Sequence, residues 1–286
     1  MAENYVALLG TKGGPAVRPG STMPTSSLLC LGGSRVVVDC GLGVTRGLID
    51  QGMQLKTLSL IFITHLHSDH YLELGPLIHT AWTAGLSTVV TVFGPKGLQD
   101  YWDSFLTSME ADISLRIEDE GRPDLAQLVD IKVMDEGEVM SQDGMSVSAM
   151  RTLHPPLVDC FALRFQGADR AVVMSGDTAY LPALADFAKG ADLLVHEAML
   201  GAALPALVAR VGNGDDRLMR HLLQSHTTAS DAAKIARDAG VGALALNHLI
   251  PSDDPDYGEA DWRGAVSPIW DGPFHPGYDG LRIDLD

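Results

Sequence analysis

Short runs of Val, Ile and Leu recur along the 286-residue chain and are separated by Gly-rich turns and by helical stretches. An apolar run of four to eight residues between turn signals favours a buried strand, whereas a longer stretch with a helical period favours a helix. The pattern predicts strands at 5–9, 26–31, 35–39, 58–63, 89–93, 131–134, 144–151, 160–166, 170–175, 191–195, 243–246 and 280–285. It predicts helices at 44–51, directly after His70, and at 96–109, 203–210, 215–223 and 228–239.

Two segments do not fit this alternation. The acidic stretch 111–130 is ambiguous, and the stretch 251–280 is rich in Pro, Gly, Asp and Trp. Elsewhere strands and helices are mixed from end to end, without a linker, a low-complexity tract or a repeat of fixed period. We therefore expect one α/β domain over 1–286, with helices covering both outer faces of packed sheets.

The densest chemical signal follows the apolar strand 58–63, where four residues lie within six consecutive positions: His65, His67, Asp69 and His70. Strand side chains alternate with a period of two, so His65 and His67 point the same way. Asp69 and His70 fall where the chain turns into a helix and approach from a second direction. Imidazole and carboxylate suit Zn²⁺ and similar ions, so two pairs of ligands predict two adjacent metal ions rather than a solvated polar loop.

Three further residues of the same chemical types end predicted strands: His154, Asp177 and His248. A single His or Asp at a strand end is more often a turn or cap residue. Two metal ions, however, need more ligands than the dense cluster supplies, and loops at strand ends are where layered α/β folds gather functional groups.

Net charge limits the classes of partner that the chain can bind, and cysteine content indicates the cell compartment. The chain carries 37 acidic and 20 basic residues, a net charge of −17, and no Lys/Arg cluster interrupts that excess. Nucleic acid and acidic membranes are therefore disfavoured as partners. No apolar stretch approaches the ~18 residues of a membrane span, and no basic segment precedes the apolar N-terminal run. Cys30, Cys40 and Cys160 form no CxxC pair, which favours a reducing cytoplasm as the location.

The order of these motifs resembles the metallo-β-lactamase fold superfamily over essentially the whole chain. Within it, the chain is most similar to the branch of the tRNA 3′-processing endonuclease RNase Z and metal-dependent arylsulfatases. The motifs that carry this similarity are HxHxDH at 65–70, Val38-Asp39-Cys40-Gly41, His196-Glu197-Ala198 and Ser225-His226-Thr227-Thr228-Ala229-Ser230. The resemblance implies a four-layer αββα sandwich of two mixed β-sheets, and a homodimer.

The resemblance also implies roles for single residues. The first metal ion would be held by His65, His67 and His154. The second would be held by Asp69, His70 and His248, with Asp177 bridging both. Asp69, His226 and Glu197 form the expected catalytic set, in which His226 handles a proton beside the substrate. Asp39 would orient the metal ligands, or it is a turn residue after its strand.

The chain departs from the family pattern at two points. The family usually continues DH-x-x-G, but Glu73 stands at that position here. Glu73 is expected either as a solvated helix residue or as a negative charge at the pocket rim. RNase Z enzymes also carry a long basic or Gly-rich arm that clamps tRNA, and no insert of that character is present.

We therefore predict a dinuclear metal-dependent hydrolase in which a metal-bridged hydroxide cleaves a small-molecule ester, lactone, cyclic amide, sulfate ester or phosphodiester. Zn²⁺ is the favoured ion, and Mn²⁺ or Fe²⁺ would also suit the ligands. An RNase Z-type nuclease and a non-catalytic metal-containing sensor or ligand-binding protein stay open as alternatives.

Five aromatic residues are expected in the core rather than the pocket: Trp82, Trp262, Trp270, Phe274 and Tyr278. Tyr71 is a better candidate for the pocket. Four histidines are expected in structural or surface positions: His79, His196, His221 and His275.

Overall fold

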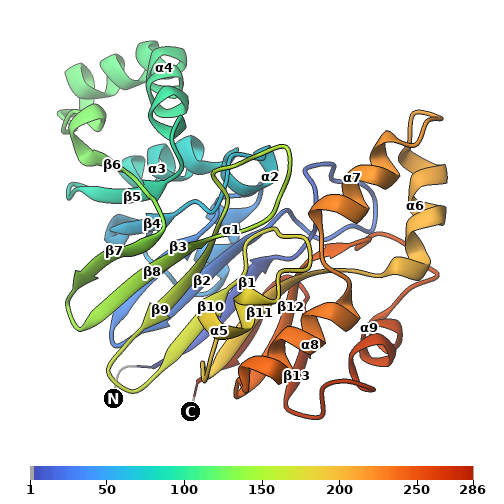
Figure 1. Cartoon of the computed structure of the whole chain (residues 1–286). Helices are drawn as coiled ribbons and strands as arrows, with labels where there is room; N and C mark the ends of the chain where they lie inside the picture. Colours follow the sequence, from blue (N-terminus) through green and yellow to red (C-terminus); the bar gives the residue numbers. More distant parts are fainter. Residues whose placement is uncertain (1–2, 286) are drawn as a thin grey trace.

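The computed structural model describes residues 3–285, and all of the strands in this range belong to two seven-stranded sheets that face each other (Figure 1). The first sheet has the order β14 (Leu281–Asp284), β1 (Tyr5–Gly10), β2 (Ser26–Leu31), β3 (Ser34–Val38), β4 (Leu60–Phe62), β5 (Val90–Gly94) and β6 (Val129–Val133). The second has the order β13 (Phe274–Pro276), β12 (Ala243–Ile250), β11 (Leu193–Met199), β10 (Ala171–Met174), β9 (Phe161–Gln166), β8 (Met145–Arg151) and β7 (Gly137–Gln142).

Both sheets are mixed. In the first, neighbouring strands run antiparallel from β14 to β3 and parallel from β3 to β6. In the second, they run parallel from β13 to β10 and antiparallel from β10 to β7. Parallel strands place their carboxyl ends at one edge of a sheet, so the loops that follow them lie close together.

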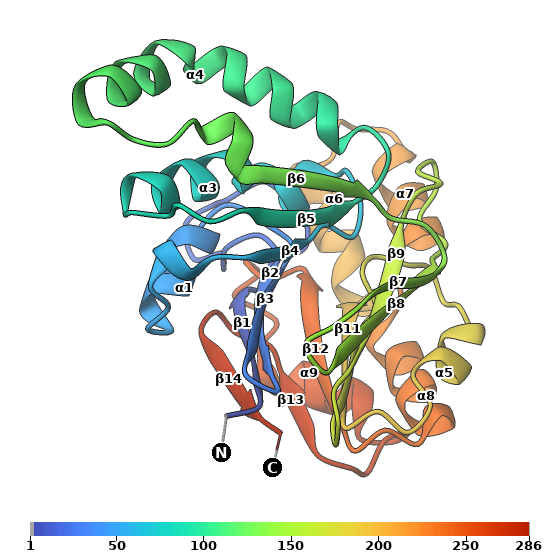
Figure 2. The same ribbon diagram turned by 90° about the vertical axis from the view of Figure 1, so that its left-hand side faces the viewer.

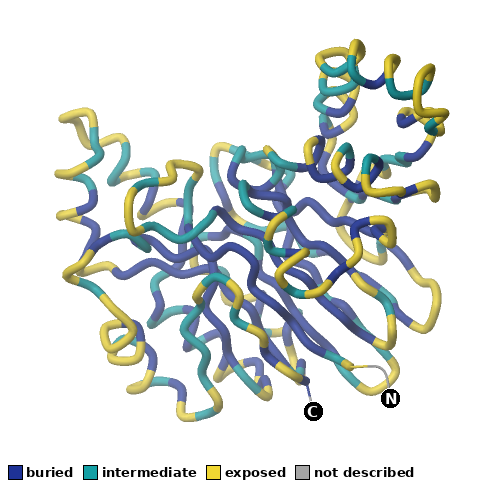
Figure 3. The backbone as a smooth tube through the Cα atoms, turned by 180° about the vertical axis from the view of Figure 1, so that it is seen from behind, coloured by how far each residue is buried: buried dark blue, intermediate teal, exposed yellow. Residues whose placement is uncertain are grey.

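Alternation along each strand divides the core into layers. In β1, Val6 and Leu8 point between the two sheets, whereas Tyr5, Ala7 and Leu9 point to the opposite face. Every residue of β1 is therefore buried, because both of its faces are covered. The dark strands at the centre of Figure 3 show the same burial in the central strands of both sheets.

Helices cover the outer faces. The first sheet is covered by α1 (Val44–Asp50), α3 (Leu74–Thr83) and α4 (Leu98–Glu120), of which α3 and α4 lie over β5 and β6 in Figure 2. The second sheet is covered by α5 (Ala183–Phe187), α8 (Ala229–Ala239) and α9 (Glu259–Val266). Three more helices lie at one edge of the sandwich: α2 (Ser68–Tyr71), α6 (Leu204–Val211) and α7 (Arg217–Ser225). The predicted sandwich of two mixed sheets with helices outside is confirmed.

The structure adds elements where the sequence pattern was weakest. The acidic segment after 111 continues α4 to Glu120, because Ile113 still packs on the core while ion pairs such as Arg116–Glu120 support its exposed side. The polar hairpin strand β7, the short helix α5, and α9 and β13 in the Pro- and Gly-rich tail were not predicted. Strand β12 extends to Ile250 rather than ending at Leu246, and this extension carries His248.

Candidate metal centre

The ligand-type residues of the sequence come together at the edge where β4, β8, β10 and β12 end. His65, His67, Asp69 and His70 lie between β4 and the end of α2, His154 follows β8, Asp177 follows β10, and His248 lies in β12. The backbone is strained at this edge: Asp39 and His248 adopt left-handed conformations with φ of 62° and 46°. Non-glycine residues adopt this conformation at a cost, which commonly occurs at functional sites.

Four side chains form the first group. His67 Nδ1 lies 2.9 Å from His154 Nε2 and 3.2 Å from His65 Nε2. Asp177 Oδ2 lies 3.6 Å from His65 Nε2 and 3.8 Å from His154 Nε2. Three of these residues are buried, and His67 is partly exposed.

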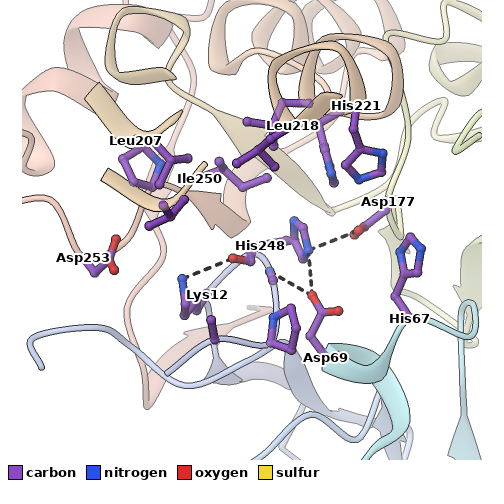
Figure 4. A pocket seen from close by; sticks show the side chains of 18 of the residues that line it. Lys12, His67, Asp69, Asp177, Leu207, Leu218, His221, His248, Ile250 and Asp253 are labelled. Carbon is purple, nitrogen blue, oxygen red and sulfur yellow. Dashed lines mark hydrogen bonds and ion pairs between the residues drawn. The ribbon is translucent and has the colours of Figure 1, made fainter. Parts of the chain in front are cut away.

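A second group lies beside the first. Asp69 Oδ2 lies 3.3 Å from His248 Nε2 and 3.6 Å from His70 Nε2. Asp177 reaches this group as well, with Oδ1 at 3.5 Å from His70 Nε2 and Oδ2 at 3.1 Å from His248 Nε2. The dashed lines of Figure 4 show how His248 faces both carboxylates.

The spacing of these atoms fits metal ions. Ligands at about 2.1 Å from a tetrahedral ion lie about 3.4 Å apart, and the distances within both groups scatter around that value. His70 Nε2 and Asp177 Oδ1 are buried and have no hydrogen-bond partner among residues 3–285. Buried polar atoms are normally paired, so a cation between these two atoms would satisfy both.

The second ring nitrogens of His154 and His70 already have hydrogen-bond partners. His154 Nδ1 donates to the carbonyl oxygen of Ser225 at 2.8 Å, and His70 Nδ1 lies 2.8 Å from Asp39 Oδ2. Asp39 also accepts from Thr64 N at 2.8 Å and from Thr64 Oγ1 at 3.0 Å. These contacts leave the Nε2 lone pairs of His154 and His70 pointing into the two groups, as metal ligands require. The interpretation of Asp39 as an orienting residue thus agrees with its contacts.

In the first group, burial and neighbouring charges keep the ligand atoms deprotonated. Burial lowers the pKa of His65 well below its usual value and the pKa of His154 to about 4. Burial would raise the pKa of Asp177, but the rings of His248, His70 and His65 outweigh it and hold that pKa well below its usual range. In the second group burial opposes the charged ring of His70, yet the surrounding carboxylates raise its pKa well above the usual value.

Glu197 and His226 form a buried pair beside the two groups. His226 Nδ1 lies 3.1 Å from Glu197 Oε1 and 3.2 Å from Oε2, and Glu197 Oε1 also accepts from Thr178 N at 2.8 Å. Burial, followed by the charge of Asp177, raises the pKa of Glu197 well above its usual value, while burial lowers that of His226. The pair fixes the ring of His226 with Nε2 left for another partner.

Both groups border a cavity of about 330 Å³, which is at the small end of the range for small-molecule sites. One wall is aliphatic and comes from α6, α7 and β12: Leu207, Val211, Leu218, Leu222 and Ile250. The opposite wall is the loop after β1, which contributes Lys12 and Arg18. Figure 4 shows Lys12 beside Asp69 and His248 and below Ile250.

Sequence reasoning missed these lining residues. His221, expected in a structural or surface position, lines the cavity, and its ring centroid lies 5.6 Å from that of His226. A helix that ends directly before His226 was the available signal, because α7 must then lie over the site. Lys12 and the aliphatic wall carry no local motif.

The aromatic residues lie elsewhere. Trp82, Trp262 and Trp270 are in the core, Phe274 packs against it, and Tyr278 is 58% exposed. Tyr71 packs against Tyr101 rather than facing the cavity.

Both expectations for Glu73 were wrong. Its carboxylate accepts from the backbone N–H groups of Gly43 at 2.5 Å and Thr45 at 3.0 Å. These groups begin α1, whose N-cap residue is a glycine without a capping side chain. Glu73 therefore caps α1 from a distance, and it does not line the cavity.

The fold and the His/Asp site define a metal-dependent hydrolase of the metallo-β-lactamase superfamily. The family model of the anti-Pycsar protein Apyc1 matches residues 6–209. Ribonuclease Z of Mycobacterium sp. (strain KMS) is 32% identical over 284 residues, which cover 98% of this chain and 95% of the relative. The chain belongs to the Apyc1 family of metallo-β-lactamase fold proteins and is related to ribonuclease Z.

Solved structures agree on the fold. The metallo-β-lactamase fold protein YhfI from Bacillus subtilis superimposes with a TM-score of 0.72 at 20% identity, with 98% of each chain covered. The short form of human tRNase Z superimposes with a TM-score of 0.69 at 20% identity, with 99% of each chain covered. Within residues 3–285, no helix has the length and apolar character needed to cross a membrane.

Proposed function

We propose that the chain hydrolyses a small cyclic phosphodiester of the cyclic nucleotide class, and that it does so with two divalent ions. The observation that carries the proposal is the cavity: it is small, it borders both His/Asp groups, and it pairs an aliphatic wall with a basic one. Such a cavity suits a ligand with an apolar ring system and an anionic phosphate. The Apyc1 family match supports the same substrate class, since that family comprises cyclic nucleotide hydrolases.

In this proposal His65, His67 and His154 hold the first ion, and Asp69, His70 and His248 hold the second. Asp177 would bridge them, because its carboxylate reaches both groups, with Oδ2 at 3.6 Å from His65 Nε2 and Oδ1 at 3.5 Å from His70 Nε2. Zn²⁺ is the favoured ion for an imidazole-rich set, although Mn²⁺ and Fe²⁺ use the same ligands. When bound, the ions supply Lewis acidity toward a phosphoryl oxygen and lower the pKa of water.

The chain's own residues supply orientation and proton transfer. The aliphatic wall excludes water from one side of the cavity and packs against the base. Because the pKa of Glu197 is raised, its carboxyl group can donate to His226 Nδ1, which leaves the ring proton on Nε2. Nε2 can then give this proton to the leaving oxygen of the substrate while Nδ1 takes the proton of Glu197. Asp69, which accepts from Gly14 N at 2.8 Å and faces His248, is held in place from two sides.

The relatives named ribonuclease Z favour a second candidate, the cleavage of precursor tRNA at its 3′ end. A net charge of −17 and a cavity of about 330 Å³ weigh against it, because tRNA binding needs an extended basic surface. A homodimer, expected from the family resemblance, stays a prediction.

The test is a substrate panel with the zinc-loaded protein. It contains 3′,5′-cyclic nucleotides with purine and pyrimidine bases, a precursor tRNA, a lactone, an aryl sulfate and a neutral aryl ester. We expect turnover of a cyclic nucleotide to the linear monophosphate, and its loss in His226→Ala. Efficient tRNA cleavage without cyclic nucleotide turnover would favour the second candidate, and turnover of the lactone or sulfate alone would refute both.

A further inference from the structure

Lys12 occupies an unusual place for a lysine. It lies two residues after the end of β1, and only 4% of its surface is exposed. Its backbone is fixed on both sides: Lys12 N donates to Met23 O at 2.9 Å, and Lys12 O accepts from Thr25 Oγ1 at 3.2 Å. A β-bridge also joins Lys12 to Leu249, the residue after His248. The position of Lys12 is thus tied to the strand that carries part of the candidate metal centre.

Among residues 3–285, no carboxylate lies within ion-pairing distance of the ammonium group of Lys12. Its one hydrogen bond within residues 3–285 goes to the carbonyl oxygen of Gly13, at a long 3.3 Å. The acid at this end of the cavity, Asp253, is already paired with Arg18 at 3.5 Å and with Arg210 at 2.9 Å. A lysine is almost never this buried without a paired charge, because removing an ammonium ion from water is costly.

The residues around Lys12 show which part of a bound ligand would lie near its ammonium group. Figure 4 places it between Asp253 and the contact of His248 with Asp69, on the wall facing Leu207 and Ile250. A ligand whose apolar part packs on the aliphatic wall and whose reacting centre lies at the His/Asp groups therefore has its charged part within the field of Lys12.

We propose that Lys12 is a specificity-determining residue that binds the negatively charged phosphoryl group of the substrate and so selects anionic phosphodiesters over neutral esters. This inference rests on the proposed function for the identity of the substrate. The bound anion pairs with the ammonium group of Lys12, so binding recovers part of the free energy that is lost by burying that charge. A neutral ester of similar size fits the cavity without this gain.

The experiment compares Lys12→Met with wild type and with Lys56→Met, a matched control that removes the same charge from an exposed position away from the cavity. The zinc-loaded proteins are assayed with bis(p-nitrophenyl) phosphate, an anionic diester, and with p-nitrophenyl acetate, a neutral ester. Binding of adenosine 5′-monophosphate is measured separately by calorimetry. Bound zinc and thermal stability are recorded for each variant.

We expect Lys12→Met to lower kcat/KM for the diester and the affinity for the monophosphate by about 10- to 100-fold, the usual effect of losing a charged hydrogen bond. The neutral ester should change by less than about threefold, and bound zinc should be unchanged. Lys56→Met should match wild type in every measurement. If Lys12→Met does not fold, Lys12→Gln replaces it, since it keeps a polar end group without the charge.

The two proposals fail differently. Monophosphate binding that depends on Lys12, without hydrolysis of any phosphodiester, would support the role of Lys12 and reject the proposed function. Diester hydrolysis that is equal in Lys12→Met and wild type would support the function and overturn the role of Lys12. Absence of monophosphate binding in wild type, or an equal loss on the diester and the ester, would also overturn it.

Discussion

The most specific consequence of the geometry concerns Asp39→Asn. Asp39 accepts three hydrogen bonds, two of them from Thr64 and one from His70 Nδ1, and it is almost completely buried. Asparagine tolerates the left-handed backbone of this position. Its side chain has one carbonyl oxygen, however, so the amide NH₂ group must face either Thr64 N–H or His70 Nδ1. In either place one hydrogen-bond donor then faces another. At least one of the three bonds is therefore lost.

The Asp39→Asn substitution should lower both the free energy of unfolding and the metal affinity. An unpaired buried donor costs about 1–3 kcal/mol of unfolding free energy. Loss of the partner that orients a metal-binding histidine typically weakens metal affinity about 10- to 100-fold, or roughly 1.4 to 2.8 kcal/mol. Among the seven ligand-type residues, only His70 is hydrogen-bonded to Asp39, so the affinity for the second ion should fall while the first ion keeps its wild-type affinity.

The assay is a zinc titration against a competing chelator. The control is Asp143→Asn, which makes the same chemical change at another left-handed aspartate, in the exposed β7–β8 turn. We expect Asp143→Asn to match wild type, and Asp39→Asn to show one tight and one weakened site. Two sites of unchanged affinity in folded Asp39→Asn would refute the reasoning, and equal weakening of both would show that Asp39 acts on the whole edge.

Three further outcomes are expected. His226→Ala should keep both ions, measured by elemental analysis, while kcat falls by about 10²- to 10⁴-fold; full activity would remove His226 from the mechanism. Burial lowers the pKa of His196 to about 4, so its neutral form stabilises the fold above about pH 6.5, and this contribution of up to about 3 kcal/mol is lost as pH falls toward 4. Denaturant unfolding of the metal-free protein at pH 7.5 and 4.5 should show the decrease, and His196→Gln should reduce it. Glu73→Ala should lower the unfolding free energy by about 1 kcal/mol through loss of the α1 cap, without changing bound zinc or KM.

The sequence predicts the site better than the elements around it. His65, His67, Asp69 and His70 are close in the chain, so a local pattern suffices to place them together. The partners His154, Asp177 and His248 could be predicted because each lies near the carboxyl end of a strand, and the carboxyl ends of these strands meet at one edge. The left-handed backbone of His248 and the extension of β12 were not predictable, since they depend on pairing with β11.

Other features depend on contacts between distant segments. Glu73 caps α1 across about 30 positions, and no local signal marks that contact. Lys12 resembles a surface lysine until the loop after β1 folds against β12. The polar strand β7 is specified by pairing with β8 rather than by apolar alternation, which explains why composition alone did not reveal it.

The central claim is that seven side chains from separate loops converge on two ions with Asp177 between them. The most direct test is the metal content per chain of wild type and of Asp177→Ala after zinc loading and removal of excess metal. The account predicts two ions in wild type and neither in the folded Asp177→Ala variant, with turnover lost together with the metal. Two ions retained by Asp177→Ala, or none bound by wild type, would contradict it.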